Sequence, residues 1–216
     1  MMMLQHLLDH DAAAPRLTVY TESTGARMDF SAQTLDNWAS KIANMLEEEL
    51  DLAAGDNILI DFPASWQAAV VALGATAAGI EYSFSPCDSA SVVFSSPDKT
   101  DQHPGADVVV LTDDPFGRGV AETGGVLPAG AIDFGPTVRF YGDQYYGTTQ
   151  PLPELFPHAG KPERLLSTGW CSREDFHNAV MHPLAAGGSA VVVCGLVSSE
   201  RLEEIASAEK VTRRAV

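Results

Sequence analysis

The chain has 216 residues, a length at which one domain buries roughly 70 % of the surface that its unfolded chain exposes. Its 29 Asp and Glu residues against 13 Lys and Arg residues give a formal net charge of −16 at pH 7, a field that repels nucleic-acid phosphates and anionic lipid surfaces. We therefore expect a single domain over residues 1–216 and exclude nucleic acid and membranes as partners.

The first predicted helix follows Ser31, which is placed to cap its N-terminus while Phe30 packs against Leu35 as a hydrophobic staple. Apolar residues recur at helical spacing and predict one buried face: Leu35, Trp38, Ile42, Met45 and Leu46. Residues 47–49 are all Glu, and the helix dipole disfavours acids at a C-terminus. They are predicted to be a solvated face rather than a site.

A strand, a helix and a second strand are predicted next. Residues 57–62 (NILIDF) are a short apolar run of strand length, which Pro63 ends. Residues 65–78 form a small-residue apolar helix, and Gly79 stands in the position that ends a helix. IEYSF follows as the next strand.

Two more short strands are predicted at 92–94 and 108–111, on either side of a surface loop that contains Pro, Gly and Asp. The segment 113–162 is rich in Gly and Pro and contains only brief strand-like pieces, such as 137–141. The sequence leaves the structure of this segment open.

Regular structure returns with a predicted strand at 164–167. Ser172 and Asp175 form a capping box for a helix that ends before Pro183. A buried strand (SAVVVC) then leads to a last helix, capped by Ser199 or its neighbour. Strands and helices alternate at 57–84 and 172–209, and such successions place helices on both faces of a sheet. We therefore expect a three-layer α/β/α fold with a mainly parallel sheet.

The N-terminal segment lacks the basic region and the long apolar stretch of a signal peptide, and no apolar run reaches about 18 residues. We therefore expect a cytoplasmic protein. Cys87, Cys171 and Cys194 are widely spaced and form no C-x-x-C pair, which indicates neither a disulfide framework nor a zinc site.

Several segments, in order, resemble one enzyme superfamily. LTVYTESTGARMDFSAQTLDNWASKIANML, GDNILIDFPAS and AAVVALGATAAGIEYSFSP, within about residues 17–86, are similar to the N-terminal part of adenylate-forming (AMP-binding, acyl-CoA synthetase-like) enzymes. RLLSTGWCSREDFHNAVMHPLAAGGSAVVV and EEIASAEKVT look like later parts of the same region. The chain is also similar to short actinobacterial members that carry only this part. The resemblance implies the fold of the N-terminal subdomain of acyl-CoA synthetases.

The sequence differs from this superfamily in the segments that bind ATP and in those that catalyse the reaction. In the family, a Ser/Thr/Gly-rich loop followed by Pro-Lys wraps the ATP phosphates with backbone amides and hydroxyls. No segment here has that composition and order. Ser167-Thr168-Gly169 is followed by Trp170 and is interpreted as the end of a buried strand. The sequence up to Val216 also contains no match to the family's ribose-binding Asp or its domain with the catalytic Lys.

The segment YYGTTQP, residues 145–151, resembles the family's adenine and phosphate motif. The resemblance implies a vestigial nucleotide site at Tyr146, Gly147, Thr148 and Thr149. The family motif ends in a Glu that helps to hold magnesium, whereas Gln150 stands here, and the motif precedes the segment that it should follow. The alternative, which we favour, is an exposed Gly/Thr turn.

Other clusters have simpler explanations. His6 and His10 share a helical face near Asp9 and could hold a metal, but solvated histidines on an N-terminal helix are favoured. His177 and His182 are five residues apart, a spacing that separates them on an α-helix.

Nucleophiles and loop charges are also weak candidates. Cys171 lies six residues before His177, which does not bring the two together on a helix, and Ser172 lacks a G-x-S-x-G elbow. The acidic pairs in 9–11 and 113–114 are predicted to be solvated. Residues 117–119 (GRG) offer either a backbone-lined cation, Arg118, or a plain turn.

Two functions remain open. The favoured one is a non-catalytic acyl-CoA synthetase-like domain, a pseudoenzyme that acts as a scaffold or binds a metabolite or partner. The alternative is an acyl-activating, adenylate-forming ligase that works alone or with a separate half. We expect no catalytic residue, no metal and no cofactor. An apolar face left exposed by a missing half would make a homodimer or bind a protein partner.

Overall fold

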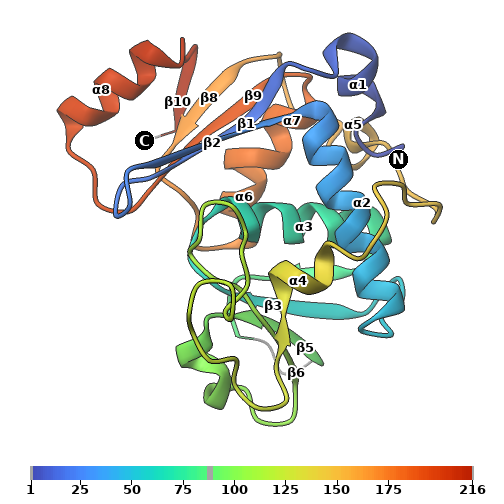
Figure 1. Ribbon diagram of the computed structural model, residues 1–216. Coiled ribbons are helices and arrows are strands. Elements are labelled where there is room, and N and C mark those ends of the chain that lie inside the picture. Colours follow the sequence, from blue (N-terminus) through green and yellow to red (C-terminus); the bar gives the residue numbers. More distant parts are fainter. Residues whose placement is uncertain (1, 87–89, 216) are drawn as a thin grey trace. The chain divides into compact units, whose positions relative to one another are not determined.

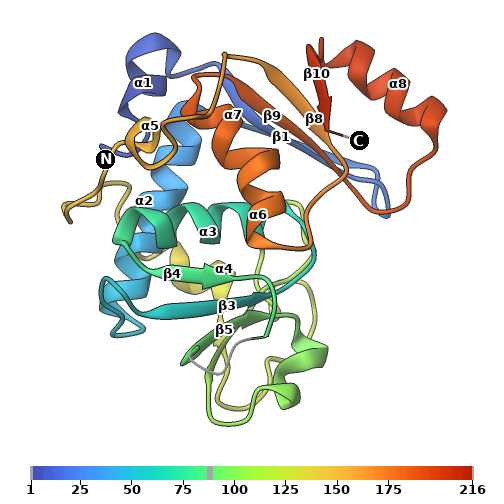
Figure 2. The same cartoon turned by 180° about the vertical axis from the view of Figure 1, so that it is seen from behind.

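The computed structural model describes residues 2–86 and 90–215. By contact density, the chain divides into two compact units (Figures 1 and 2). Unit 1 comprises Met1–Asp36, Ala64–Trp66 and Gln150–Val216, and unit 2 comprises Asn37–Pro63 and Gln67–Thr149. Neither unit is one continuous segment, and each is described by itself. The single domain expected over residues 1–216 stays a prediction.

Unit 1 contains a five-stranded sheet in the order β10-β8-β9-β1-β2. The strands are β1 (Pro15–Thr21), β2 (Ala26–Ser31), β8 (Arg164–Ser167), β9 (Ser189–Cys194) and β10 (Arg213–Ala215). β1 and β2 form an antiparallel hairpin, which the sequence interpretation missed, and all other pairs are parallel. The strands predicted at 164–167 and over SAVVVC are confirmed.

Helices lie on both sides of the unit 1 sheet (Figure 1). α8 (Ser199–Ala208) is capped by Ser198, whose hydroxyl accepts a hydrogen bond from the Arg201 amide at 3.1 Å. One cluster joins α8 to the strands and consists of Tyr20, Leu166, Val191, Val193, Ile205 and Ala206. The second helical segment, which contacts β8 and β9, is built from α6 (Arg173–Phe176), η2 (His177–Met181) and α7 (His182–Ala185). Unit 1 therefore has three layers. Its short helices α1 (Gln5–Asp11) and α5 (Leu152–Leu155) complete it.

The capping box predicted at Ser172 and Asp175 is confirmed, but the end of that helix was predicted wrongly. The helical segment continues through Pro183 to Ala185. The five residues before α7 form a π turn, in which the His182 amide donates to the His177 carbonyl. A proline ring collides with the carbonyl four residues back in an α-helix, and the wider π turn relieves that collision.

Unit 2 contains a second sheet, in which every pair is parallel, in the order β4-β3-β5-β6-β7. The strands are β3 (Asn57–Asp61), β4 (Glu81–Ser83), β5 (Val92–Ser95), β6 (Asp107–Val110) and β7 (Ile132–Asp133). The helical elements are α3 (Trp66–Ala78) between β3 and β4, η1 (Pro97–Gln102) between β5 and β6, and α4 (Phe134–Val138) after β7. The sequence interpretation expected one sheet, whereas the strands form two. The α/β class with mainly parallel strands is confirmed.

The longest helix, α2 (Ala32–Glu48), starts in unit 1 and continues in unit 2. The Ser31 hydroxyl accepts from the Thr34 amide at 3.1 Å, which confirms the predicted cap. Within unit 2, α2 and α3 approach so closely that a Cβ on Gly74 would lie 2.4 Å from the Ile42 Cγ2 atom. Gly79 has φ +71° and ends α3 as predicted.

Two local predictions were wrong. The strand-like piece at 137–141 is the end of α4 and a turn, and the strand in this region is β7. The segment between β5 and β6 contains η1 rather than a plain loop. In the described part of the chain, no helix combines the length and apolar character that a membrane-spanning helix requires.

Candidate functional site

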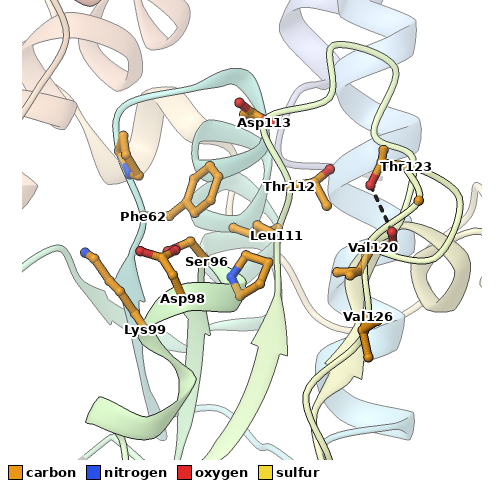
Figure 3. Close-up of a pocket in the computed structure, with 14 residues that line it drawn as sticks. Phe62, Ser96, Asp98, Lys99, Leu111, Thr112, Asp113, Val120, Thr123 and Val126 are labelled. Carbon is orange, nitrogen blue, oxygen red and sulfur yellow. Dashed lines mark hydrogen bonds between the residues drawn. The ribbon is translucent and has the colours of Figure 1, made fainter.

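The strand order of unit 2 predicts where a ligand would bind. After β3 the chain moves to β4 on one side, and after β5 it moves to β6 on the other, so the connections diverge between the adjacent strands β3 and β5. In open parallel sheets, ligands bind outside the carboxyl ends of the strands at such a switch point. A cavity of about 740 Å³ lies at these strand ends (Figure 3).

The cavity has a largely apolar lining. It is bordered by residues that follow β3, β5 and β6 and by the loop 120–126, and its apolar members are Phe62, Pro63, Pro97, Leu111, Val120 and Val126. Leu111 and Val120 are buried, whereas Val126 is 88 % exposed. The polar lining residues are Ser96, Asp98, Lys99, Thr112, Asp113 and Thr123. An apolar cavity with a few polar groups is typical of small-molecule sites.

Carboxylates fix the loop that forms one wall of the cavity. The Glu122 carboxylate accepts from the Gly119 amide at 2.7 Å and pairs with Arg139 at 2.6 Å. The Asp133 carboxylate accepts from the Val120 amide at 2.9 Å. A Cβ on Gly135 would lie 2.4 Å from the Gly117 carbonyl oxygen, so the backbone is closely packed here. These contacts hold the wall in one conformation.

The two acids predicted at 113–114 have different environments. Asp113 is exposed, lines the cavity and has no hydrogen-bonded or ion-paired partner among the residues that the structure describes. Asp114 is buried, pairs with Arg118 at 2.7 Å and accepts from the Phe116 amide at 2.9 Å. The hydrogen bond from Arg118 lowers the pKa of Asp114. The expectation of two solvated acids is wrong for Asp114, and the 117–119 segment is a turn held by this ion pair.

The residues implied as a nucleotide site lie elsewhere in unit 2 and do not line the 740 Å³ cavity. Tyr146 is 88 % exposed, Thr148 is exposed and Thr149 is buried. Gly147 lies against the Tyr145 ring, since a Cβ there would be 2.1 Å from the Tyr145 hydroxyl. Nucleotide binding by Tyr146, Gly147, Thr148 and Thr149 stays a prediction.

The glutamates at the end of α2 are bonded to tyrosines rather than only solvated. The Tyr145 hydroxyl donates to Glu47, and the Tyr141 hydroxyl donates to Glu49 at 2.8 Å. Burial and the hydrogen bond to Glu49 raise the pKa of Tyr141 to about 12. These pairs attach the 141–145 segment to α2.

The histidine predictions need correction. His6 is half-buried, with its Nε2 atom 2.8 Å from the Leu184 carbonyl oxygen, so it is not a solvated histidine, whereas His10 is exposed. His177 and His182 lie 6.4 Å apart between ring centroids, and both contact the Phe156 ring. The spacing argument assumed an α-helix, and the π turn η2 brings the two rings nearer together.

The cysteine, serine and metal hypotheses gain no support. Cys171 is exposed, and its backbone amide donates to Asp175, while the Ser172 hydroxyl serves the capping box. Cys194 is buried, and burial raises its pKa to about 12. Cys87 lies outside the described residues. Within residues 2–86 and 90–215, no three His, Cys, Asp or Glu side chains are grouped so as to hold a metal.

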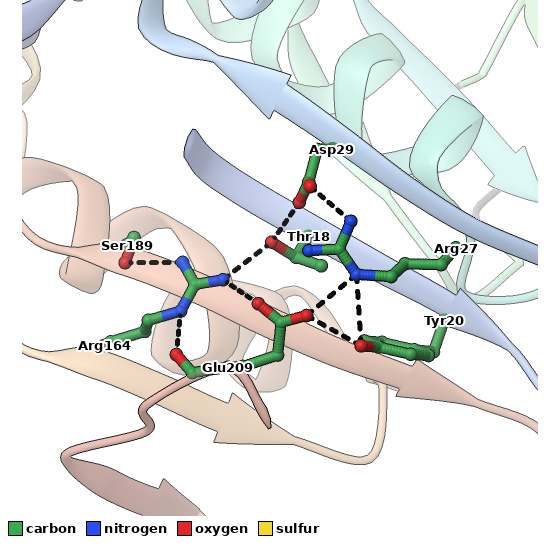
Figure 4. Close-up of polar contacts among 7 residues, drawn as sticks. All are labelled: Thr18, Tyr20, Arg27, Asp29, Arg164, Ser189 and Glu209. Atoms are coloured by element: carbon green, nitrogen blue, oxygen red, sulfur yellow. Dashed lines mark hydrogen bonds and ion pairs between the residues drawn. The ribbon is translucent and has the colours of Figure 1, made fainter. Parts of the chain in front are cut away.

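Unit 1 also contains a buried ionic network centred on Glu209, which no sequence pattern indicated (Figure 4). The Glu209 side chain is 7 % exposed and accepts from Arg27 at 2.8 Å, from Tyr20 at 2.7 Å and from Arg164 at 2.5 Å. Burial alone would raise the pKa of Glu209, but the hydrogen bonds from Arg27, Tyr20 and Arg164 outweigh it and lower the pKa to about 2.

Arg164 is the second centre of this network. Its guanidinium donates to the Glu209 carbonyl at 2.7 Å, to Ser189 at 3.1 Å and to Thr18 at 2.9 Å. The Thr18 hydroxyl in turn donates to Asp29 at 2.6 Å. The network joins β1, β2, β8 and β9 to the end of α8 and engages both carboxylate oxygens of Glu209, which indicates a structural role.

No protein-family model matches the chain. The fold is similar to an acyl-CoA synthetase from Brucella canis, with a TM-score of 0.78 and 15 % identity over 99 % of this chain and 47 % of that one. It is also similar to acetoacetyl-CoA synthetase from Streptomyces lividans, with a TM-score of 0.72 and 14 % identity over 98 % of this chain and 41 % of that one. The chain thus spans less than half the length of these enzymes. The expected likeness to the N-terminal part of adenylate-forming enzymes is confirmed at the level of the fold.

A relative of similar length also exists. A TIGR03089 family protein of Mycobacterium tuberculosis is 33 % identical over 236 aligned residues, which cover 98 % of this chain and 95 % of the relative. Because this identity extends over nearly the full length of both proteins, the chain belongs to the TIGR03089 family.

Proposed function

We propose that the protein is a non-catalytic acyl-CoA synthetase-like domain that binds a small molecule in the unit 2 cavity. The observation that carries this proposal is the cavity of about 740 Å³ at the switch point of the parallel sheet. Small-molecule sites typically have volumes of roughly 300 to 1,000 Å³ and a mostly apolar lining with few polar groups. Both properties occur here on a wall that carboxylate–amide hydrogen bonds hold in place.

The residue content argues against adenylate formation. The sequence has no Ser/Thr/Gly-rich loop followed by Pro-Lys, and Gln150 stands where the resembling motif has a magnesium-binding Glu. An amide is a weaker ligand for magnesium than a carboxylate. Losing one preorganised donor of the oxyanion-hole type costs roughly 10² to 10³ in rate, and several donors are missing together.

An acid-dependent ATP–pyrophosphate exchange assay with short, medium and long acyl chains tests the absence of catalysis. The expected result is no exchange above a blank without protein. Exchange that Thr148→Ala or Thr149→Ala abolishes would replace the proposal with the alternative, an acyl-activating ligase that acts alone or with a separate half.

Ligand binding is tested independently of catalysis by protein-observed NMR with 2-phenylethanol, a neutral apolar probe. We expect the largest chemical-shift changes at Phe62, Leu111 and Val120. The matched control is residues 146–149, which do not line the cavity and should not respond. Saturating binding elsewhere, with no change at the lining residues, would contradict a ligand site in this cavity.

A further inference from the structure

We infer that the ligand of the unit 2 cavity is an apolar molecule that carries an amine or another cation, rather than a carboxylic acid or a nucleotide. This inference rests on the proposed function, because it uses the same cavity. It follows from three features of the lining: the charges that face the cavity, the hydrogen-bonding capacity of its polar groups, and its apolar surface.

The charges that face the cavity are mostly negative. Asp98 and Asp113 line it, and Lys99 is the one basic side chain among its lining residues. Lys99 is already paired, because its Nζ atom lies 2.6 Å from Asp61 Oδ1, and the other oxygen of Asp61 lies 3.1 Å from His103 Nε2. The lysine charge is therefore offset by a carboxylate outside the lining, and the two lining aspartates remain unbalanced.

The environment of Asp98 favours its ionised form. A hydrogen bond from Ser96 lowers the pKa of Asp98, and its own backbone amide adds to this effect. Asp113 has no partner in the described part of the chain. Asp98 follows β5 and Asp113 follows β6, and Figure 3 shows the two residues at different strand ends.

Several hydroxyl and amide donors of the lining are already used. The Thr112 hydroxyl donates to the Arg118 carbonyl at 2.7 Å, and the Thr123 hydroxyl donates to the Val120 carbonyl at 3.0 Å. The amides of Gly124 and Gly125 donate to the carbonyls of Ala121 and Val120 at 3.1 and 2.8 Å. Carboxylates accept hydrogen bonds but do not donate them when ionised. The carboxylates of the cavity thus offer acceptors that suit a ligand with hydrogen-bond donors.

The apolar part of the lining indicates the chemistry of the rest of the ligand. Phe62, Leu111 and Val120 provide the surface for an aromatic or aliphatic body, and the Phe62 ring also attracts a cation that lies over its face. A phosphate or carboxylate group would instead face two aspartates in a protein of net charge −16. The chemical class that fits is a small aryl-alkyl or alkyl amine.

Matched probes test the charge requirement on the full-length chain. 2-Phenylethylamine, 2-phenylethanol and 3-phenylpropanoate have similar apolar bodies with a positive, neutral or negative head group. We expect the amine to bind about tenfold more tightly than the alcohol, as a hydrogen bond to a charged group implies. The carboxylate should bind more weakly than the alcohol, and added salt should weaken only the amine.

Variants test whether Asp98 and Asp113 cause the preference for the amine. Asp98→Asn together with Asp113→Asn should reduce amine affinity about tenfold, to that of the alcohol, without changing the alcohol itself. The matched control is Asp107→Asn, an exposed aspartate at the start of β6 that does not line the cavity. It should leave all three affinities unchanged. Urea unfolding of each variant verifies that the fold is retained.

The outcomes separate the inference from the proposed function. If the alcohol and the amine bind equally and both perturb Phe62, Leu111 and Val120, the cavity is a ligand site but the charge requirement is wrong. Tighter binding of the carboxylate at these residues would also overturn the inference. If no probe perturbs the lining residues, the proposed ligand site fails together with the inference.

Discussion

Replacing Glu209 by Gln tests whether the buried network stabilises unit 1 through charge. The Glu209 side chain is 7 % exposed, and its partners Arg27 and Arg164 are 43 % and 18 % exposed. Gln keeps the size of the side chain but removes the negative charge that both guanidinium groups share. Breaking a buried ion pair costs about 3 to 5 kcal/mol because an uncompensated charge remains. Since water reaches Arg27, we expect about 3 kcal/mol at pH 7.

The pKa of Glu209 gives an independent magnitude. It lies at about 2 in the folded protein against an ordinary value of 4.5. At about 1.4 kcal/mol per pKa unit, this lowering corresponds to about 3 kcal/mol. Because the folded pKa is depressed, this stabilisation is fully present above pH 4.5 and is lost as the pH falls towards 2. About 1 kcal/mol of it should be gone at pH 4.

Urea unfolding of the wild type and of Glu209→Gln at pH 7, 5 and 4 measures this contribution. The difference in unfolding free energy should be largest at pH 7 and about 1 kcal/mol smaller at pH 4. The control is Glu203→Gln, which alters an exposed carboxylate on α8 that pairs with Arg214, and which should not move the urea midpoint. A difference at pH 7 below about 1 kcal/mol, or one that does not depend on pH, would refute the reasoning.

Other properties can be measured on the same protein. Gly74→Ala should destabilise the protein by about 1 to 3 kcal/mol in urea unfolding, because the new Cβ would lie 2.4 Å from Ile42 Cγ2. An unchanged urea midpoint would contradict this close packing. In a Cys87→Ser variant, iodoacetamide at pH 8 should label the exposed Cys171 and not Cys194, because Cys194 is buried and its pKa is raised to about 12. Mass spectrometry distinguishes the two labelled cysteines. Labelling of Cys194 in the folded protein would contradict this expectation and show that β9 opens. The homodimer expected from the sequence stays a prediction, and light scattering that gives a monomer at high concentration would contradict it.

Local signals predicted two helix starts and one helix end correctly. Ser31 and Ser172 cap helices where their side chains find an amide three residues later, and Gly79 ends α3 with a positive φ. These interactions lie within one turn of chain, so the residue types carry the information. The fold class followed from the order of such elements.

Pairing between distant segments was not predictable in the same way. Nothing near β1 indicates that it pairs with β9, so the division of the strands into two sheets was missed. The helix was predicted to end before Pro183 because proline disrupts a regular α-helix, and the sequence pattern did not indicate the π turn that accommodates it.

The candidate site was predicted only in part. Asp113 was named as an acid, but Asp98 was not, although it follows a strand end in the same way. The wall of the cavity falls within the Gly-rich segment that the sequence left open. Glu209 gave no signal because its partners Arg27 and Arg164 are brought together only by the folded sheet.

The two sheets differ in when a growing chain can complete them. The strands of unit 2 lie within residues 57–133, so its sheet can form as soon as that segment has left the ribosome. β1 is made first in unit 1, yet its second neighbour, β9, begins at Ser189. Until then β1 has only β2, and an isolated hairpin is marginally stable in water. Among the strand edges that become paired in the described chain, the edge of β1 that binds β9 is therefore exposed for the longest time during synthesis. It is the segment at which chaperone binding or aggregation of the nascent protein should begin.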